Sequence, residues 1–265
     1  MRVYVEGVGL LGPGLNGWQA SRPVLAGDAP YVPAPTVVTA SDLLPAAERR
    51  RTGLPVKLAL AAGREAFVHA GRDAAITAMV FTSSSGDGDN LDHICATLAS
   101  TEREISPTRF HNSVHNAPAG YWSIATHSQA SSTSLCAHDA SFTAGLLDAS
   151  AQIAFDGSPV ALIAYDQTYP EPLHSVRPIG ASFGAALVLS PQAGEHAFAT
   201  LDISFVAAQA DASRMADGAL DALRSGVPAA RCLPLLAALA RRTAAIVVLA
   251  YGAENHLRVE VTPWH

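Results

Sequence analysis

The sequence has 265 residues, of which 49% are hydrophobic and only 15% are charged, and its formal net charge is −6. This length and composition indicate a well-buried α/β protein with a sizeable core. The acidic balance argues against a nucleic-acid-binding surface, which would need a basic stripe. Arg49-Arg50-Arg51 is a short basic run and predicts a solvated loop or helix end.

The cysteine pattern and the length of the apolar runs indicate the cellular compartment of the protein. Cys95, Cys136 and Cys232 are odd in number and far apart, which does not indicate a disulfide framework. The N-terminus enters a β-prone run without an apolar leader, and no apolar run reaches the length of a membrane span. We therefore expect a cytoplasmic protein with no membrane span.

Residues 1–190 alternate between β-prone runs and segments with helical periodicity. We expect strands over residues 2–11, 75–81, 131–136, 159–165 and 180–189. We expect helices over residues 55–70, 88–100 and 142–155, and a loop with one short helix across residues 15–50. The order of these elements favours an α/β architecture in which helices connect the strands.

The remaining residues predict a smaller set of elements. A strand is expected over residues 198–208, followed by helices over 212–225 and 233–242. Two further runs, 244–250 and 257–261, predict a closing hairpin around a Gly-Ala-Glu-Asn turn.

The stretch from Asn116 to Ala151 contains the most informative turn. Its β-prone run Ser-Thr-Ser-Leu-Cys ends at Cys136, and Ala-His-Asp-Ala-Ser then leads into the apolar helical segment. A strand, a tight turn and a helix together hold one side chain at a helix N-terminus, which favours a nucleophile or an anion. Asp139 is placed to act as an N-cap, as an acidic carboxylate.

Several segments together resemble the β-ketoacyl synthase family of the thiolase-like superfamily. They are the opening VYVEGVGLLGPG, the helix KLALAAGREA, the run SPTRFHNSVHNAPAGY with the SIA that follows it, and the strand GASFGAALVL. The resemblance implies a thiolase-like α/β fold with a mixed five-stranded sheet in layers. It also implies a ketoacyl-synthase-like half over residues 1–190, with a strongly shortened second half over residues 191–265 packed on it.

The resemblance breaks down at the catalytic positions. Counting without gaps from Ala119-Gly120 places the family's nucleophilic cysteine position on Asp139. Cys136 lies three residues earlier, within the expected strand, where we expect a buried side chain. The family's two histidines, in H-G-T and N-x-x-G-H contexts, have no counterpart, since His256 and His265 match neither motif. The resemblance thus implies no catalytic residue, with Cys136, His138 and Ser141 as neighbours of a vestigial site.

A relative without nucleophile or histidines is similar to the chain-length-factor subunits that pair with an active ketosynthase. Its short length resembles the β-ketoacyl synthase-like proteins of aryl polyene biosynthesis. The resemblance implies a heterodimer with a full-length β-ketoacyl synthase, contact with acyl carrier protein through that complex, and a homodimer when the protein is made alone. The expected interface residues are Phe110, Asn116, Tyr121, Trp122, Ser132, Thr133, Ser134 and Leu135.

Other interpretations of the same residues stay open. One is a small acyl-thioester enzyme, a decarboxylase or hydrolase using Asp139 or His138 or a triad that adds Ser141. Another is a stand-alone acyl-binding protein. The Ser/Gly run 82–88 lacks the lysine and spacing of a phosphate loop, and the pair His111 and His115 lacks a third metal ligand, so we expect neither cofactor nor metal.

Overall fold

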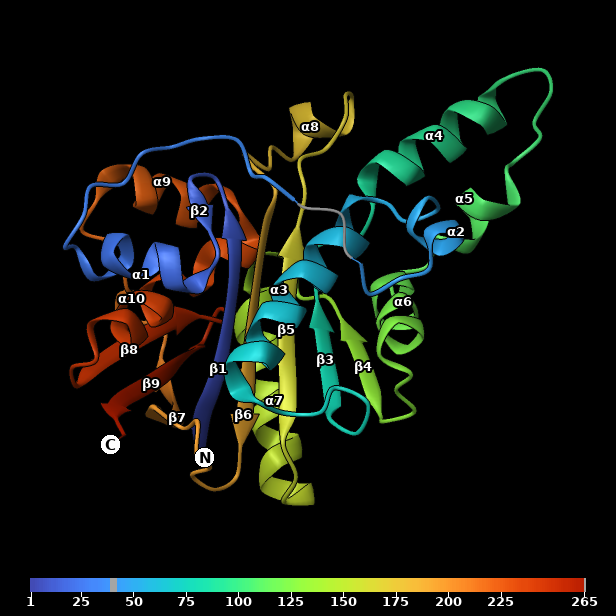
Figure 1. The fold of residues 1–265 in the computed structure, drawn as a ribbon. Helices are drawn as coiled ribbons and strands as arrows, with labels where there is room; N and C mark the ends of the chain where they lie inside the picture. Colours follow the sequence, from blue (N-terminus) through green and yellow to red (C-terminus); the bar gives the residue numbers. More distant parts are fainter. Residues whose placement is uncertain (39–41, 265) are drawn as a thin grey trace.

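The computed structural model describes residues 1–38 and 42–264, and a single sheet organises them (Figure 1). The strands are β1 (Arg2–Gly12), β2 (Leu15–Asn16), β3 (Ala78–Thr82), β4 (Ser132–Leu135), β5 (Val160–Asp166), β6 (Phe183–Ser190), β7 (Ala199–Ala207), β8 (Ala245–Ala250) and β9 (Asn255–Pro263). The α-helices are α1 (Trp18–Ala26), α2 (Ala46–Arg49), α3 (Leu54–Ala70), α4 (Gly88–Ala99), α5 (Pro107–His111), α6 (Ala117–Thr126), α7 (Ser141–Asp156), α8 (Leu173–Val176), α9 (Gly218–Gly226) and α10 (Leu233–Arg241). Two 3₁₀ helices, η1 (His138–Ala140) and η2 (Pro228–Cys232), complete the described elements.

The strand order within the sheet is β4-β3-β5-β6-β1-β7-β9-β8, and β2 pairs with the end of β1. β4, β3 and β5 run parallel, whereas β6 pairs antiparallel with both β5 and β1. The strands β4-β3-β5-β6-β1 form the mixed five-stranded sheet that the sequence predicts for residues 1–190. The predicted layered α/β arrangement with a mixed sheet is confirmed, and these five strands are part of a sheet with nine described strands.

Both faces of the central strands are covered by helices. Alternate residues of a strand point to opposite faces, and in β5 Val160 and Leu162 pack in a core with α7, while Ala161 and Ile163 pack in a second core with α3. Every residue of β5 and β6 is buried. Burial on both faces explains why these strands read as continuous apolar runs in the sequence.

Helix α3 lies unusually close to β1. Cβ atoms added to Gly7 and Gly9 would overlap the backbone carbonyl oxygens of Ala66 and Ala62, respectively. The glycines of β1 therefore let the two backbones approach without intervening side chains. The opposite face of β1 carries Val3, Val5, Val8 and Leu10, all fully buried in the α7-side core.

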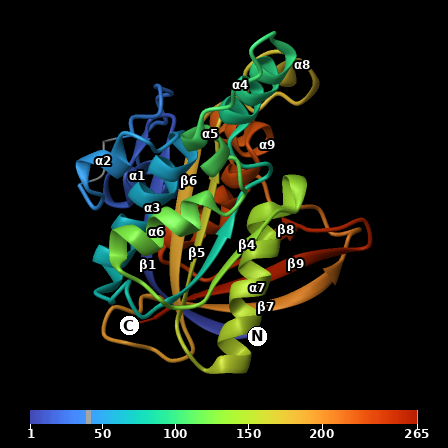
Figure 2. The same ribbon diagram turned by 90° about the vertical axis from the view of Figure 1, so that its right-hand side faces the viewer.

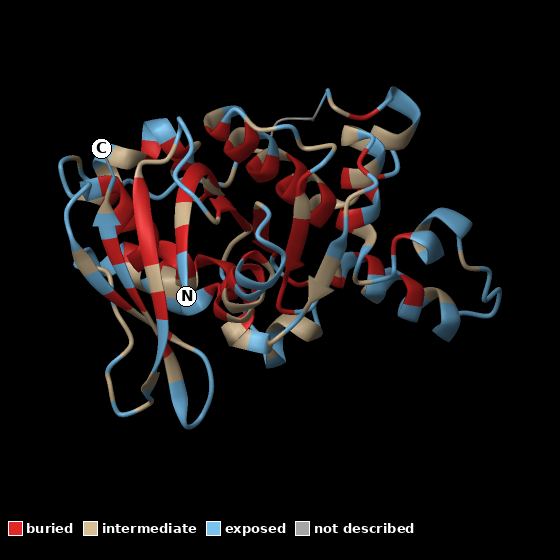
Figure 3. Cartoon of the chain, turned by 90° about the horizontal axis from the view of Figure 1, so that it is seen from below, coloured by how far each residue is buried: buried red, intermediate tan, exposed pale blue. Residues whose placement is uncertain are grey.

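Helix α7 is buried on the side that packs against the sheet and is only partly covered on its outward side. Its sheet-facing side, which includes Phe142, Leu146 and Ile153, is buried. Its outward side is exposed towards the C-terminal end, where Phe155 is 91% exposed. Figure 3, seen from below, shows buried central strands and a near end of α7 that carries exposed residues.

The C-terminal strands continue the same sheet, because β7 pairs antiparallel with β1 and then with β9. The predicted hairpin is confirmed as the antiparallel pair β8 and β9. The helix expected from residue 212 begins only at Gly218, because the Asp217 carboxylate accepts hydrogen bonds from the backbone N–H groups of Ala219 and Leu220 as its N-cap. The expected division at residue 190 stays a prediction.

Replacing Gly9 with alanine should destabilise the fold. The added methyl group would collide with the Ala62 carbonyl, and overpacking against a backbone that cannot yield typically costs about 1–3 kcal/mol or more. We expect a lower urea midpoint for Gly9→Ala. The matched control is Gly218→Ala, since no atom lies within 4 Å of a Cβ added at Gly218. Equal midpoints for the two variants would contradict the close helix–strand contact.

Candidate functional site

The turn between β4 and α7 is held by backbone and hydroxyl hydrogen bonds. His138 adopts a left-handed backbone with φ of 52°. The Ser141 hydroxyl donates to the His138 carbonyl at 2.7 Å and accepts from the Ala137 N–H at 3.0 Å. These two hydrogen bonds close the short helix η1 and hold the backbone from which the Asp139 side chain extends.

Two arginines hold the Asp139 carboxylate. Arg177 donates from Nη2 to Oδ1 at 2.9 Å, and Arg231 donates from Nη2 to Oδ2 at 2.8 Å. Arg177 follows α8 and Arg231 lies in η2, so the pair reaches the turn from two distant parts of the chain. Each oxygen of the carboxylate therefore has its own charged donor.

The environment keeps Asp139 ionised. Burial alone would raise the pKa of its carboxyl, but the hydrogen bond from Arg177 and the charges of Arg231, Arg177 and His138 outweigh burial and lower the pKa. The expected N-cap role is wrong, because α7 begins without a side-chain cap and both Asp139 oxygens face arginines. A carboxylate engaged in this way is a poor acyl carrier.

The structure corrects the expected burial of Cys136. β4 ends at Leu135, and Cys136 is exposed just beyond it. Its Sγ lies 3.2 Å from the Ser84 carbonyl oxygen. Cys95 and Cys232 are also free thiols, and burial raises the pKa of the Cys232 thiol well above its usual range.

The hydrolytic triad is not assembled. The Ser141 hydroxyl is bound to the backbone, and Ser141 is 1% exposed. His138 Nδ1 lies 3.5 Å from the Asp139 carboxylate, but the His138 side chain is 69% exposed. His256 lies in the β8–β9 hairpin, where its Nδ1 accepts from the Tyr251 N–H at 3.4 Å.

A second carboxylate, which the sequence analysis did not single out, lies at the end of β5. Asp166 is 2% exposed and accepts hydrogen bonds from the Ser84 N–H and hydroxyl, the Ser83 hydroxyl and the Ala229 N–H, at 2.8 to 3.1 Å. Burial raises the pKa of this carboxyl, although the hydrogen bonds oppose the shift. The Ser/Gly loop thus binds an internal carboxylate through Ser83 and Ser84.

The predicted interface strand lies at an edge of the sheet. β4 pairs with β3 alone among the described strands, and Figure 2 shows it between α6 and α7. Ser132 is exposed, and Thr133, Ser134 and Leu135 are half-buried. The structure therefore brings these four residues to one accessible edge.

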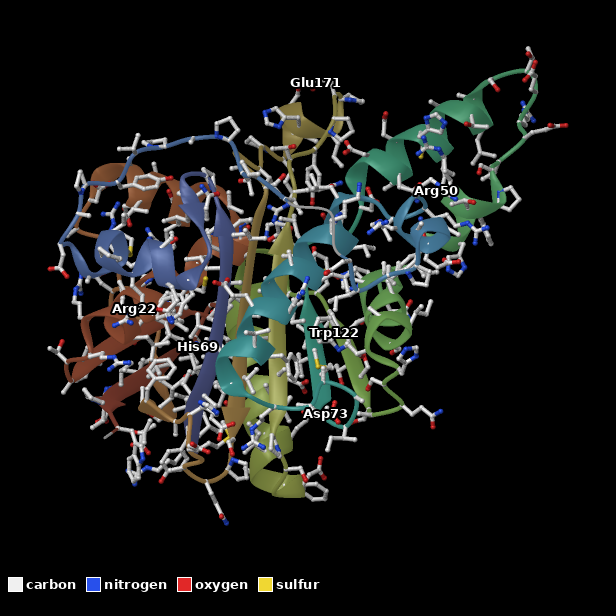
Figure 4. The ribbon with its side chains drawn as sticks, viewed as in Figure 1. Arg22, Arg50, His69, Asp73, Trp122 and Glu171 are labelled. Carbon is white, nitrogen blue, oxygen red and sulfur yellow. The ribbon has the colours of Figure 1, made fainter. Side chains whose placement is uncertain are left out.

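The other predicted interface residues fall into two groups. Phe110 is 67% exposed and Asn116 is also exposed, and both line an apolar groove of about 610 Å³ between α5 and α6. Tyr121 and Trp122 are 2% and 1% exposed. Trp122, which Figure 4 labels, packs against Phe67 and Phe81 inside the α3-side core. Because Trp122 is buried, it cannot contact a partner directly and can only pack under the residues that do.

The two histidines considered as a metal pair, His111 and His115, lie in different elements. His111 ends α5, whereas His115 follows in the turn before α6, so the two histidines do not share one helix. Across residues 1–38 and 42–264, no three histidine, cysteine, aspartate or glutamate side chains gather in a way that could hold an ion. Within the same residues, no helix has both the length and the apolar character that crossing a membrane requires.

The family described as β-ketoacyl synthase, N-terminal domain matches residues 18–246, and the chain belongs to this family. A comparison with curated proteins gave no match.

Solved structures share the fold over the whole chain. A chain from the ketosynthase ApeO in complex with its chain length factor ApeC, from Xenorhabdus doucetiae, aligns with a TM-score of 0.73 and 21% identity over 99% of both chains. The ishigamide ketosynthase/chain length factor aligns with a TM-score of 0.73 and 13% identity over 100% of both chains. A β-ketoacyl synthase from Burkholderia phymatum STM815 aligns with a TM-score of 0.61 and 16% identity, over 87% of this chain and 70% of that one. These likenesses establish a ketosynthase-type, thiolase-like fold.

Replacing Asp166 with asparagine should strongly lower the free energy of unfolding. The carboxylate accepts three hydrogen bonds at Oδ1 and one, from the Ala229 N–H, at Oδ2, so an amide whose oxygen takes the Oδ1 position would turn its NH₂ group towards the Ala229 donor. A buried network broken in this way costs about 2–4 kcal/mol. We expect Asp166→Asn to lower the urea midpoint, whereas Asp156→Asn, at an exposed position, should leave it unchanged. A wild-type midpoint for Asp166→Asn would rule out this anchoring role.

Proposed function

We propose that this protein is a non-catalytic, chain-length-factor-like partner subunit of a β-ketoacyl synthase in fatty-acid or polyketide-type biosynthesis. The observation that carries the proposal is Asp139, whose carboxylate fills the family's nucleophile position and is held by Arg177 and Arg231. Condensation needs a thiolate, assisting imidazoles and an oxyanion hole. The partner would supply the groups that this chain lacks.

The two ends of the sheet support the choice of β4 as the partner edge. At the β8 end, the Ser213 N–H donates to the Val248 carbonyl at 2.8 Å, and the Ser213 hydroxyl accepts from the Val248 N–H at 2.9 Å. Ser213 thereby blocks the middle of that edge. β4 carries neither lysine nor proline as a guard, so an unpaired edge of this kind favours a covering strand.

The register of β4 identifies the groups that a partner strand would bind. Ser131 and Leu135 accept hydrogen bonds from the N–H groups of Met79 and Ser83 in the neighbouring strand region. Alternate residues turn their backbone groups to the same side of a strand, so those of Thr133 also face β3. The backbone N–H and C=O groups of Ser132 and Ser134 point to the open edge.

Apolar surfaces flank this edge on both sides. The groove between α5 and α6 includes the exposed side chains of Phe110, Val114 and Ile124. On the other side, α7 presents a partly exposed stripe at helical spacing, made of Ala144, Leu147, Ala151, Ala154 and Phe155. Gln152 of α7 donates to the Thr133 hydroxyl at 3.3 Å and connects this stripe to β4. Strand and flanking surfaces together suit an obligate interface of more than roughly 2,000 Å².

The structural relatives support the same assignment. Two of them come from ketosynthase/chain length factor pairs, and a third structure contains a type II polyketide acyl carrier protein in complex with its ketosynthase. By analogy we propose a full-length ketosynthase as the partner, acyl carrier protein bound through the complex, and an aryl polyene pathway. The free thiols suit a reducing compartment such as the cytoplasm.

The acyl-binding alternative draws on the apolar groove, which is large enough for part of a fatty chain. The groove opens beside β4 and is as accessible to a partner side chain as to an acyl group. An acyl-binding protein would stay monomeric when mixed with a ketosynthase. The proposed subunit would form a heterodimer, or a homodimer through β4 when made alone.

Proline at position 134 should weaken the complex with little damage to the fold. The substitution removes an N–H group that faces the open edge, a site where proline is tolerated in strands. We expect Ser134→Pro, co-expressed with a full-length ketosynthase from the same genome, to shift light scattering from heterodimer to separate subunits. Its Tm alone should stay close to wild type.

The controls separate loss of pairing from loss of fold. Ser134→Ala keeps the backbone donor and should keep the complex. Thr133→Pro removes a group that faces β3 and should lower the Tm of the isolated protein. A Ser134→Pro complex as stable as the wild-type complex would show that β4 is not the contact. A wild-type protein that does not bind the ketosynthase would refute the proposal.

The isolated protein should form no stable acyl-enzyme with acyl-CoA or acyl carrier protein thioesters. Asp139 is engaged by two arginines, and the exposed Cys136 thiol has no activating partner. We expect intact mass spectrometry to show the unmodified mass, and Asp139→Cys alone should not confer condensation because the imidazoles are missing. A stable adduct that disappears in Cys136→Ala would refute the non-catalytic assignment.

A further inference from the structure

The two arginines that contact Asp139 also have the arrangement of a binding site for a carboxylate. Arg177 and Arg231 converge on one carboxylate, each donating to a different oxygen. The side chains of Arg177 and Arg231 are 24% and 26% exposed, so each is about three-quarters buried, while that of Asp139 is 40% exposed. Two positive charges brought together in this way repel each other unless an anion lies between them.

The arginines keep donor capacity beyond the contacts with Asp139. The Nε of Arg231 is buried and makes no hydrogen bond with a described residue. Guanidinium groups match the planar geometry of a carboxylate and bind it through several N–H groups. The cluster thus has the geometry of a carboxylate receptor rather than of a surface ion pair.

We propose that Arg177 and Arg231 form a carboxylate-binding site which the chain fills with its own Asp139 side chain. While Asp139 occupies the site, an external acid cannot reach the arginines, and the former nucleophile position stays closed. When the internal carboxylate is removed, a small external carboxylate of similar size binds in its place. This inference does not depend on the proposed partner, because it concerns the isolated chain.

Chemical rescue of Asp139→Ala tests the site. The variant leaves the two arginines unneutralised, so we expect a Tm below that of wild type in sodium chloride. Replacing chloride with sodium acetate at constant ionic strength should raise the Tm of the variant by about 3 °C or more, with saturation, because a ligand that binds the folded state stabilises it. Wild type and the control Asp156→Ala should show no saturable rise.

A second variant assigns the response to the arginines. In Asp139→Ala/Arg231→Ala the receptor has lost one donor group, and acetate should no longer raise the Tm above the chloride value. If Asp139→Ala is insoluble in chloride, purification in acetate should recover it. The proposal is overturned if acetate acts equally on Asp139→Ala and wild type, if the double variant responds like the single one, or if acetate fails to recover an insoluble variant.

Discussion

The two carboxylates of Asp166 and Asp139 fasten the short helix η2 to the β5 and β4–α7 regions of the fold. Asp166, at the end of β5, accepts from the Ala229 N–H, and Asp139, in the turn before α7, binds Arg231. Both contacts reach η2, so this short helix is fastened at two points to the ends of the central strands. Sequence separations of 63 and 92 residues make these contacts long-range constraints, and each sits where ionic interactions are only partly screened by water.

Much of the fold could be predicted because local patterns and burial agree. Val160 to Asp166 form a continuous apolar run up to the final carboxylate, and the structure buries every one of these residues. The Gly7 and Gly9 positions in β1 match a strand that a helix approaches closely. The late start of α9 was also encoded locally, in the capping residue Asp217, but apolar periodicity upstream of it suggested an earlier start.

The site could be predicted only in part. Counting from Ala119-Gly120 singled out Asp139 as the nucleophile position, which stays a prediction, and nothing in the local sequence pointed to Arg177 or Arg231 as its partners. Their pairing depends on a loop and a 3₁₀ helix that lack a periodic signal. The exposure of Cys136 was missed because its position depends on where β4 ends, and strand ends are the least certain part of a sequence pattern.

The closed site and the open edge lie on one continuous segment, since β4 ends at Leu135 and Asp139 follows in the next turn. Arg177 and Arg231 hold the turn that contains Asp139, and this turn holds the C-terminal end of β4. An edge held in place before binding loses little conformational entropy when a second strand pairs with it. Under the proposal that Asp139 occupies the family's nucleophile position, a carboxylate there has two consequences. The position has no acyl carrier, and its ion pairs with Arg177 and Arg231 make the turn an anchor that holds the end of β4.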